Sequence, residues 1–193
     1  MDDYPGMVIG VIWIVFLVFW LVSSFTAKKI ARREGRAGIG RRVLTGLIGY
    51  FLFYRAADPA FGVLSHRFLP DDIRIASIGA IMTALGVLVA IWARIHIGKY
   101  WSATVALKSD HQLIRTGPYA RMRHPIYTGI LLALAGTAVA IGRYAALVGL
   151  AIYFGVFWIK ARKEEAMLVG EFGPAFEEHR RSTGFFLPKL FAH

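Results

Sequence analysis

Gly117-Pro-Tyr-Ala-Arg-Met-Arg-His-Pro-Ile-Tyr-Thr-Gly129 places a polar cluster directly before a long apolar segment. A Gly-Pro turn, two tyrosines, a histidine and two arginines gather in this stretch. Pro125 suits the first turn of a helix, where its missing N–H costs little and its φ is already helical. The stretch therefore predicts an apolar helix with a polar cluster at its start. If that helix enters a membrane, a soluble cofactor could meet a lipid-like substrate there.

Five long uncharged runs indicate a membrane protein. The chain has 193 residues, about the length of one domain. Its hydrophobic content of 56% and mean hydropathy of +0.52 are high for a soluble domain. Because crossing the hydrocarbon core takes roughly 20 helical residues, we predict an all-α integral membrane protein. It has about five transmembrane helices in a single membrane domain over residues 1–193. The runs are 7–25, 43–54, 75–93, 125–142 and 144–159.

The first run does not read as a cleaved signal peptide. It follows the acidic Asp2 and Asp3 instead of a basic segment, and no small-x-small site closes it. We expect it to remain as a membrane anchor. The second and fifth runs are shorter and need flanking arginines and lysines that extend toward the headgroups.

The distribution of positive charge predicts the orientation. The net charge is +11, and of the 23 Lys and Arg residues, segments 26–42 and 94–124 and the tail from Lys160 hold seven, six and six. The segments expected on the other side hold none, two and one. This asymmetry is typical of the positive-inside rule. It places the N-terminus outside and the C-terminus in the cytoplasm. Because no basic–aromatic module accompanies the charge, we expect no nucleic-acid partner.

The two halves of the chain differ in kind. Residues 1–93 read as scaffold helices, the third of which carries spaced small residues that permit close helix packing. Residues 94–193 hold most of the polar chemistry. The fifth helix is expected to continue past the membrane to about residue 168, and a Gly-Pro break at 173–174 starts a short helix over 175–181. The small residues are Ala76, Gly79, Ala80, Thr83 and Gly86.

His124 and Tyr127 lie three residues apart and share one helix face. Together they offer aromatic surfaces and hydrogen-bonding groups that suit a purine ring. A belt of interfacial aromatic residues at a helix end explains the same pair without any ligand. Spacing alone leaves both interpretations open.

Lys160 and Glu164 are i,i+4 neighbours, with Arg162 between them. One interpretation is a cytoplasmic helix extension stabilised by a modest ion pair. The other is a carboxylate that captures an ammonium or sulfonium group, beside a cation that holds an anionic substrate. Spacing alone favours the first interpretation.

Several chemistries are excluded or disfavoured. The chain has no cysteine, which excludes disulfides and thiolate catalysis. The histidines lack metal-site spacing, so we expect no metal. Ser109-Asp110-His111 are adjacent loop residues and rarely satisfy triad geometry. No Gly-x-Gly-x-x-Gly or phosphate loop is present.

Three ordered motifs carry a family resemblance. The segments 111–119, 123–129 and 164–168, with Phe172-Gly173 and Phe186-Leu-Pro188, resemble the isoprenylcysteine carboxyl methyltransferase family. The resemblance covers about residues 94–188. Members are integral-membrane enzymes that use S-adenosyl-L-methionine. It implies methyl transfer to a lipophilic acceptor, most like carboxyl O-methylation of an isoprenylcysteine-type substrate.

The resemblance also implies a cytoplasmic cofactor site closed by a C-terminal helix. The catalytic candidates are Lys160, Arg162 and Glu164. Lys160 stands where the best-known members have an arginine that is implicated in binding the substrate carboxylate, and lysine lacks arginine's planar fork. Phe176 and His179 stand where the family often has two tyrosines. The residues implied to bind cofactor are His111, Gln112, Leu113, Ile114, Tyr119, His124, Pro125, Ile126, Tyr127 and Glu164.

Three other functions fit the same chain. A phospholipid or amine methyltransferase would share the cofactor site, an NADPH-dependent sterol-type reductase would bind a 2′-phosphorylated nucleotide, and a membrane scaffold would bind neither. The Ala-, Gly- and Arg-rich composition suggests a bacterial cytoplasmic membrane, with the active site facing the cytoplasm. In that setting a prenylated protein substrate is disfavoured, and a small lipophilic acid, amine or thiol becomes the expected acceptor. The sequence does not determine the oligomeric state.

Overall fold

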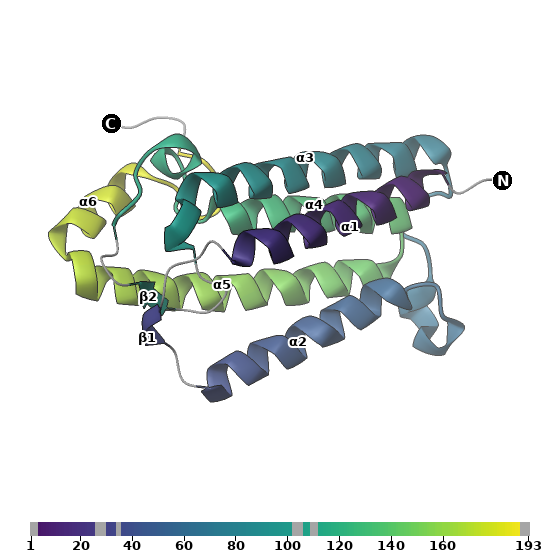
Figure 1. Ribbon diagram of the computed structural model, residues 1–193. Coiled ribbons are helices and arrows are strands. Elements are labelled where there is room, and N and C mark those ends of the chain that lie inside the picture. Colours follow the sequence, from purple (N-terminus) through teal and green to yellow (C-terminus); the bar gives the residue numbers. More distant parts are fainter. Residues whose placement is uncertain (1–3, 26–29, 34–35, 102–105, 109–111, 190–193) are drawn as a thin grey trace.

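Long helices make up most of the computed structural model, which describes residues 4–25, 30–33, 36–101, 106–108 and 112–189 (Figure 1). The predicted helical class is confirmed, and each predicted run lies within a helix to within one residue. The α-helices are α1 (Tyr4–Ser24), α2 (Arg36–Tyr54), α3 (Ile73–Ile97), α4 (Pro125–Ile141), α5 (Tyr144–Phe172) and α6 (Pro174–Ser182). Short 3-10 helices are η1 (Pro59–Ser65), η2 (Gly98–Tyr100) and η3 (Gly117–Ala120).

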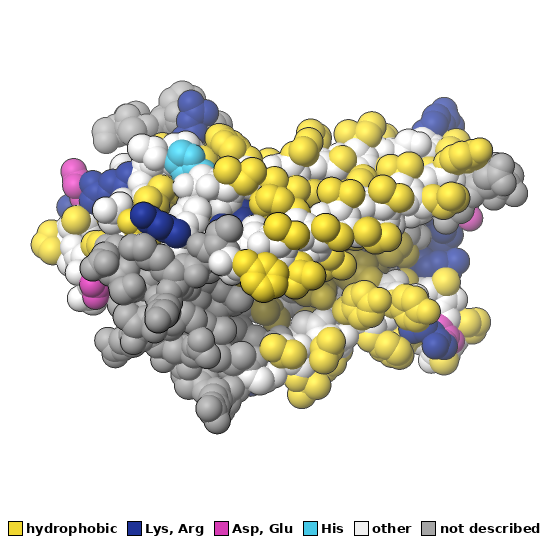
Figure 2. Space-filling view, in the orientation of Figure 1, with side chains coloured by type: hydrophobic (Ala, Val, Ile, Leu, Met, Phe, Trp, Pro, Cys, Tyr) yellow, Lys and Arg dark blue, Asp and Glu magenta, His cyan; other side chains and the backbone are white. Residues whose placement is uncertain are grey.

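Three helical segments are long and apolar enough to cross a membrane: Tyr4–Ser24, Ile73–Tyr100 and Tyr144–Phe172. Two shorter apolar helices, Val43–Tyr54 and Pro125–Ile141, accompany them. Hydrophobic side chains cover the middle of the visible face, and charged side chains gather toward the two ends (Figure 2). This surface matches an apolar slab between two aqueous phases.

Two short strands were not predicted. β1 (Ile30–Arg33) and β2 (Ala106–Lys108) pair antiparallel. Each strand has three or four residues, too few for a period-2 pattern to stand out in the sequence. α2 also begins at Arg36, before the second predicted run, which starts at residue 43.

α3 and α4 pack backbone against backbone. A Cβ added to Gly79 would lie 2.6 Å from the Gly136 carbonyl oxygen, and one on Gly129 would lie 2.5 Å from the Ala90 amide nitrogen. A Cβ on Gly86 would overlap the backbone of α4 in the same way. Small residues allow this approach, which is the usual basis of helix packing in membranes. The packing predicted for the third helix is confirmed at these glycines.

Hydroxyl groups reinforce this helix pair and attach α1 to it. The buried Thr83 hydroxyl donates to the Gly79 carbonyl at 2.9 Å and lies 3.3 Å from the Thr137 hydroxyl. The Trp13 indole N–H of α1 donates to the Thr137 hydroxyl at 3.1 Å. Interhelical hydrogen bonds of this kind average about 0.6 kcal/mol in a membrane. They therefore align the helices more than they hold them together.

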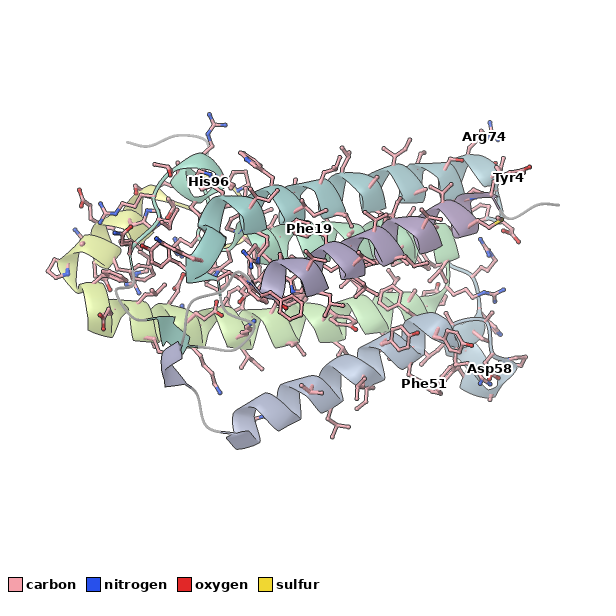
Figure 3. All side chains as sticks on the ribbon, in the orientation of Figure 1. Tyr4, Phe19, Phe51, Asp58, Arg74 and His96 are labelled. Atoms are coloured by element: carbon pink, nitrogen blue, oxygen red, sulfur yellow. The ribbon has the colours of Figure 1, made fainter. Side chains whose placement is uncertain are left out.

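The helix connections bring the ends of several helices to the same end of the bundle. Gly142 ends α4 in the left-handed conformation at φ 66°, which favours glycine, and permits the tight turn into α5. The C-terminus of α3, the start of α4, the end of α5 and α6 meet at the end marked by His96 (Figures 1 and 3). Tyr4, Asp58 and Arg74 lie at the opposite end (Figure 3).

Candidate functional site

A pocket opens at the end of the bundle where α3, α4, α5 and α6 meet. It is formed by side chains from the end of α3, the segment before α4, the first turn of α4, the last turns of α5, and α6. Apolar and aromatic groups dominate the lining, with a few polar groups among them, as is typical of small-molecule sites. The lining residues are Ile97, Tyr100, Trp101, Gln112, Leu113, Ile114, Tyr119, Arg123, His124, Ile126, Tyr127, Glu164, Met167, Leu168, Phe176 and His179.

Glu164 presents a carboxylate to this pocket. The Tyr127 hydroxyl lies 2.7 Å from both carboxylate oxygens and donates to them. His124 Nδ1 lies 3.9 Å from Glu164 Oε2. His124, at the start of α4, and Glu164, on α5, therefore converge on the pocket. A ligand group placed between them would meet a negative charge and a ring nitrogen together.

Aromatic rings build one wall beside this carboxylate. The rings of His124 and Tyr127 stack at 5.5 Å and 11°, and Tyr127 stacks on Phe157 at 5.0 Å and 14°. The ammonium of Lys160 lies 5.1 Å from the centroid of the Tyr127 ring and 3.9 Å from Glu164 Oε1. Lys160 and Phe157 lie toward the middle of α5, whereas Glu164 lies nearer its end. The site thus places a cation on the side of the carboxylate that faces the middle of α5.

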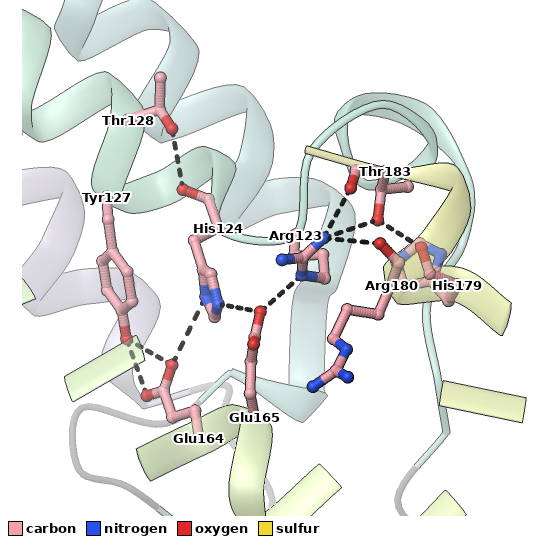
Figure 4. A network of polar contacts seen from close by, with 9 residues as sticks. All are labelled: Arg123, His124, Tyr127, Thr128, Glu164, Glu165, His179, Arg180 and Thr183. Atoms are coloured by element: carbon pink, nitrogen blue, oxygen red, sulfur yellow. Dashed lines mark hydrogen bonds and ion pairs between the residues drawn. The ribbon is translucent and has the colours of Figure 1, made fainter. Parts of the chain in front are cut away.

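Arg123, which lines the pocket, forms a buried ion pair with Glu165, which lies behind the lining. Arg123 Nε lies 2.5 Å from Glu165 Oε1, and His124 Nε2 lies 3.3 Å from the same oxygen (Figure 4). Arg123 also donates from Nη1 to the Thr183 carbonyl at 2.6 Å and to the Arg180 carbonyl at 3.1 Å. One guanidinium therefore connects α5 to the segment that follows α6.

α6 covers the pocket and is attached to the segment before η3. Arg115 pairs with Glu178 at 3.3 Å and donates to the Ala175 carbonyl. Gly173, at φ 51°, joins α5 to α6. Below α6, burial raises the pKa of the Tyr119 phenol, and the nearby Glu164 carboxylate adds to this effect. Tyr119 therefore stays a neutral phenol in the pocket wall.

Most residues implied to bind cofactor do line the pocket. Pro125 is fully buried beneath it and starts α4 instead of lining it. Lys160 lies beside the pocket, and Arg162 is exposed on α5. His111 lies outside the described residues. The lining members of the predicted set are Gln112, Leu113, Ile114, Tyr119, His124, Ile126, Tyr127 and Glu164.

Sequence reasoning missed the residues that other elements bring to the pocket. Trp101 and Tyr100 follow α3, far from the motifs in sequence. Met167 and Leu168 lie one turn after Glu164, and this i+3, i+4 spacing could have identified them. No local signal distinguished Glu165, because its partners come from a different part of the chain.

The pocket should make stability depend on pH through His179. Burial lowers the pKa of His179, and the neighbouring Arg115 and Arg123 lower it further, while Glu165 opposes them. The folded state therefore holds a neutral imidazole that the unfolded chain protonates near pH 6.5. Stability is full above that pH and falls as the pH drops below it, because the unfolded state then binds more protons.

We expect the thermal midpoint in detergent to decrease from about pH 7 to about pH 5, and to decrease less in His179→Gln. An equal decrease in both proteins would contradict this.

Chemically, the arrangement suits an organic cation with a flat ring system. Glu164 supplies negative charge, and the stacked rings offer faces that attract cations. Among the described residues, no group of three or more His, Asp or Glu side chains is placed to hold a metal ion. The fold and pocket define a helical integral membrane protein with a largely apolar pocket, holding a few polar groups, at one end.

Comparison with known proteins finds one matching family model. Residues 79–170 match the model of the isoprenylcysteine carboxyl methyltransferase (ICMT) family. This segment runs from α3 to the last turn of α5 and includes His124, Tyr127 and Glu164. Over this segment the protein is similar to the isoprenylcysteine carboxyl methyltransferase family, which confirms the resemblance carried by the sequence motifs.

Two of three similar proteins carry the name of this methyltransferase, and the third is named as a metal-resistance protein. The protein-S-isoprenylcysteine O-methyltransferase of Schizosaccharomyces pombe is 31% identical over 101 residues, which are 51% of this chain and 43% of the relative. The enzyme of the same name from Saccharomyces cerevisiae is 29% identical, over 90% of this chain and 74% of the relative. The cobalt-zinc-cadmium resistance protein CzcN of Cupriavidus metallidurans is 28% identical, over 49% of this chain and 44% of the relative. The match thus spans about half the length of the first and third of these relatives.

Proposed function

We propose that the protein is an S-adenosyl-L-methionine-dependent membrane methyltransferase that acts on a lipophilic acceptor, most like the carboxylate of an isoprenylcysteine-type compound. The observation that carries this proposal is the Glu164 carboxylate, which faces a pocket walled by aromatic and apolar side chains. The family match and the names of two relatives support the same reaction class.

The pocket residues fit the donor's chemical groups. S-adenosylmethionine carries an ammonium, a positively charged sulfur and a flat purine. Glu164 would hold the cationic end, because an ionised acceptor strengthens a hydrogen bond. The apolar side chains of Leu113, Ile114 and Ile126 would contact the purine. α6 would then exclude water from above, through Phe176.

Catalysis in this site would rest on positioning. When bound, S-adenosylmethionine supplies an electrophilic methyl group on a positively charged sulfur. An acceptor carboxylate is already ionised at neutral pH and needs no general base. The protein's residues would therefore align the acceptor with the methyl group and exclude water. Glu164 and the aromatic wall would hold S-adenosylmethionine, and Lys160 would orient the acceptor carboxylate.

The acceptor would approach from the membrane side of the pocket. We place five helices across the bilayer: the three long apolar segments and the two shorter apolar helices. The N-terminus lies outside, and the pocket lies on the cytoplasmic side. The basic segments around the pocket end support this orientation. A lipophilic tail could then remain in the hydrocarbon while its headgroup reaches Lys160.

A two-part experiment tests the function. Purified protein in detergent is titrated with S-adenosylmethionine and, separately, with NADPH. It is then given methyl-labelled S-adenosylmethionine with a prenylcysteine or with a phospholipid extract. The proposal expects saturable binding of S-adenosylmethionine and label in the prenylcysteine ester. Binding of NADPH alone refutes the methyltransferase, and label only in phospholipid refutes the carboxylate acceptor.

Lys160, not Arg162, should determine the affinity for the acceptor. The Lys160 ammonium lies beside Glu164 and Tyr127, whereas Arg162 is exposed. We expect Lys160→Met to raise the KM for the prenylcysteine roughly tenfold, because a charge-assisted hydrogen bond is worth about 1.5 kcal/mol. The affinity for S-adenosylhomocysteine should change much less. Steady-state kinetics of Lys160→Met and Arg162→Met compare the two candidates directly, and a larger effect at Arg162 would reverse the assignment.

A further inference from the structure

His124 lies between two carboxylates, and the position of its proton decides what the pocket presents. Nε2 lies 3.3 Å from Glu165 Oε1, and Nδ1 lies 3.9 Å from Glu164 Oε2 (Figure 4). A neutral imidazole carries one proton and has one acceptor nitrogen. If the proton is on Nδ1, His124 donates toward Glu164 and occupies the carboxylate that a cation would need. If the proton is on Nε2, Nδ1 becomes a second acceptor beside Glu164.

The surroundings of Glu165 favour the second state. Glu165 is 4% exposed and accepts from Arg123 Nε at 2.5 Å, which keeps it an ionised acceptor without a proton to donate. Its contact with His124 therefore requires the proton on Nε2. Glu165 also lies closer to the imidazole than Glu164 does.

The position of the ring leaves little freedom to exchange these roles. The His124 ring stacks on Tyr127 and meets the edge of Phe185 at 5.0 Å. The backbone around it is held as well, because the His124 amide donates to the Phe185 carbonyl at 3.3 Å. Arg123 is fixed by the Thr183 and Arg180 carbonyls. A rigid ring between two acceptors is oriented by its outer partner, as metal-binding histidines are.

We infer that Glu165 is a positioning residue that holds the proton of His124 on Nε2, so that Nδ1 and the Glu164 carboxylate form a pair of acceptors for the cationic end of the ligand. This inference rests on the proposed S-adenosylmethionine site. Glu165 does not line the pocket and acts only through His124. The pair of acceptors explains why a second carboxylate follows Glu164 directly in the sequence.

The proton can be located without any ligand. In ¹⁵N-histidine-labelled protein in detergent, at a pH of about 7.5, where a free imidazole is mostly neutral, the nitrogen signals distinguish a protonated ring nitrogen from an unprotonated one. The His124 signals are those that disappear in His124→Ala. We expect a neutral ring with the proton on Nε2. A proton on Nδ1, or on both nitrogens, overturns the inference.

Binding then separates a positioning role from a structural one. Glu165→Gln keeps the side-chain volume and removes the charge, and Glu171→Gln is a matched exposed control on the same helix. We expect Glu165→Gln to weaken S-adenosylhomocysteine binding about tenfold, and Glu171→Gln to leave it unchanged.

In a His124→Ala background, Glu165→Gln should weaken binding less than about twofold, because its effect passes through the missing ring. An equal cost in both backgrounds would show a structural role and overturn the inference. If the unmodified protein binds no S-adenosylhomocysteine, the proposed function fails, whereas the ¹⁵N result still stands.

Discussion

Replacing Glu164 with glutamine is expected to weaken S-adenosylmethionine binding roughly 10- to 100-fold. The carboxylate is the only described acidic side chain that lines the pocket, and a cation bound there would lose its charged partner. Glutamine keeps an oxygen that can accept from the Tyr127 hydroxyl, so the wall of the pocket should persist. Methyl transfer should fall with cofactor occupancy, and saturating donor should restore part of the rate.

Calorimetric or fluorescence titration in detergent measures this effect. Glu171→Gln, an exposed change on the same helix, serves as the control for lost charge on α5. Thermal unfolding should show that Glu164→Gln remains folded. An affinity for S-adenosylmethionine equal to that of the unmodified protein would remove Glu164 from the site and with it the main support for the proposed function.

Replacing Gly86 with leucine is expected to prevent α3 and α4 from packing. Even a Cβ at this position would overlap the Ala133 amide nitrogen and lie 2.5 Å from the Gly129 carbonyl oxygen. The obstacle is backbone, which cannot rotate away as a side chain can. We expect a loss of about 3 kcal/mol or more of stability, the upper part of the usual range for overpacking. Because α4 carries His124 at its start, ligand binding should be lost as well.

Gly10→Leu is the matched control, since Gly10 lies in α1 with no atom near its would-be Cβ. Its stability should stay close to that of the unmodified protein. Size-exclusion profiles and thermal midpoints in detergent compare the two variants. If Gly86→Leu unfolds at the same temperature as Gly10→Leu, the close packing of α3 on α4 is wrong.

Local patterns predicted the helices because hydrophobic runs and turn residues act over short distances. The start of α4 at Pro125 and the turn at Gly142 came from residues with strong backbone preferences. The continuation of α5 past residue 159 was also predicted and is found. The start of α2 and the strand pair were not, because short elements depend on their partners more than on their own residues.

The candidate site divides in the same way. His124 and Tyr127 share a helix face, and Glu164 lies on a second helix, so motifs identified them without showing their distance. Family resemblance, not spacing, made the functional interpretation the stronger one. Glu165 was overlooked because nothing in its own segment predicts a buried ion pair with Arg123.

From its residues alone, the chain determines an apolar helical protein with its polar chemistry in the second half, since hydrophobicity and turn chemistry are properties of neighbouring residues. Which side of each helix faces another, and which of two adjacent carboxylates meets the ligand, were decided only when distant segments came together. Glu164 reaches the pocket and Glu165 reaches Arg123 because consecutive helical residues point about 100° apart. Only the packing of α4 against α5 determines which of the two carboxylates faces the pocket and which faces Arg123.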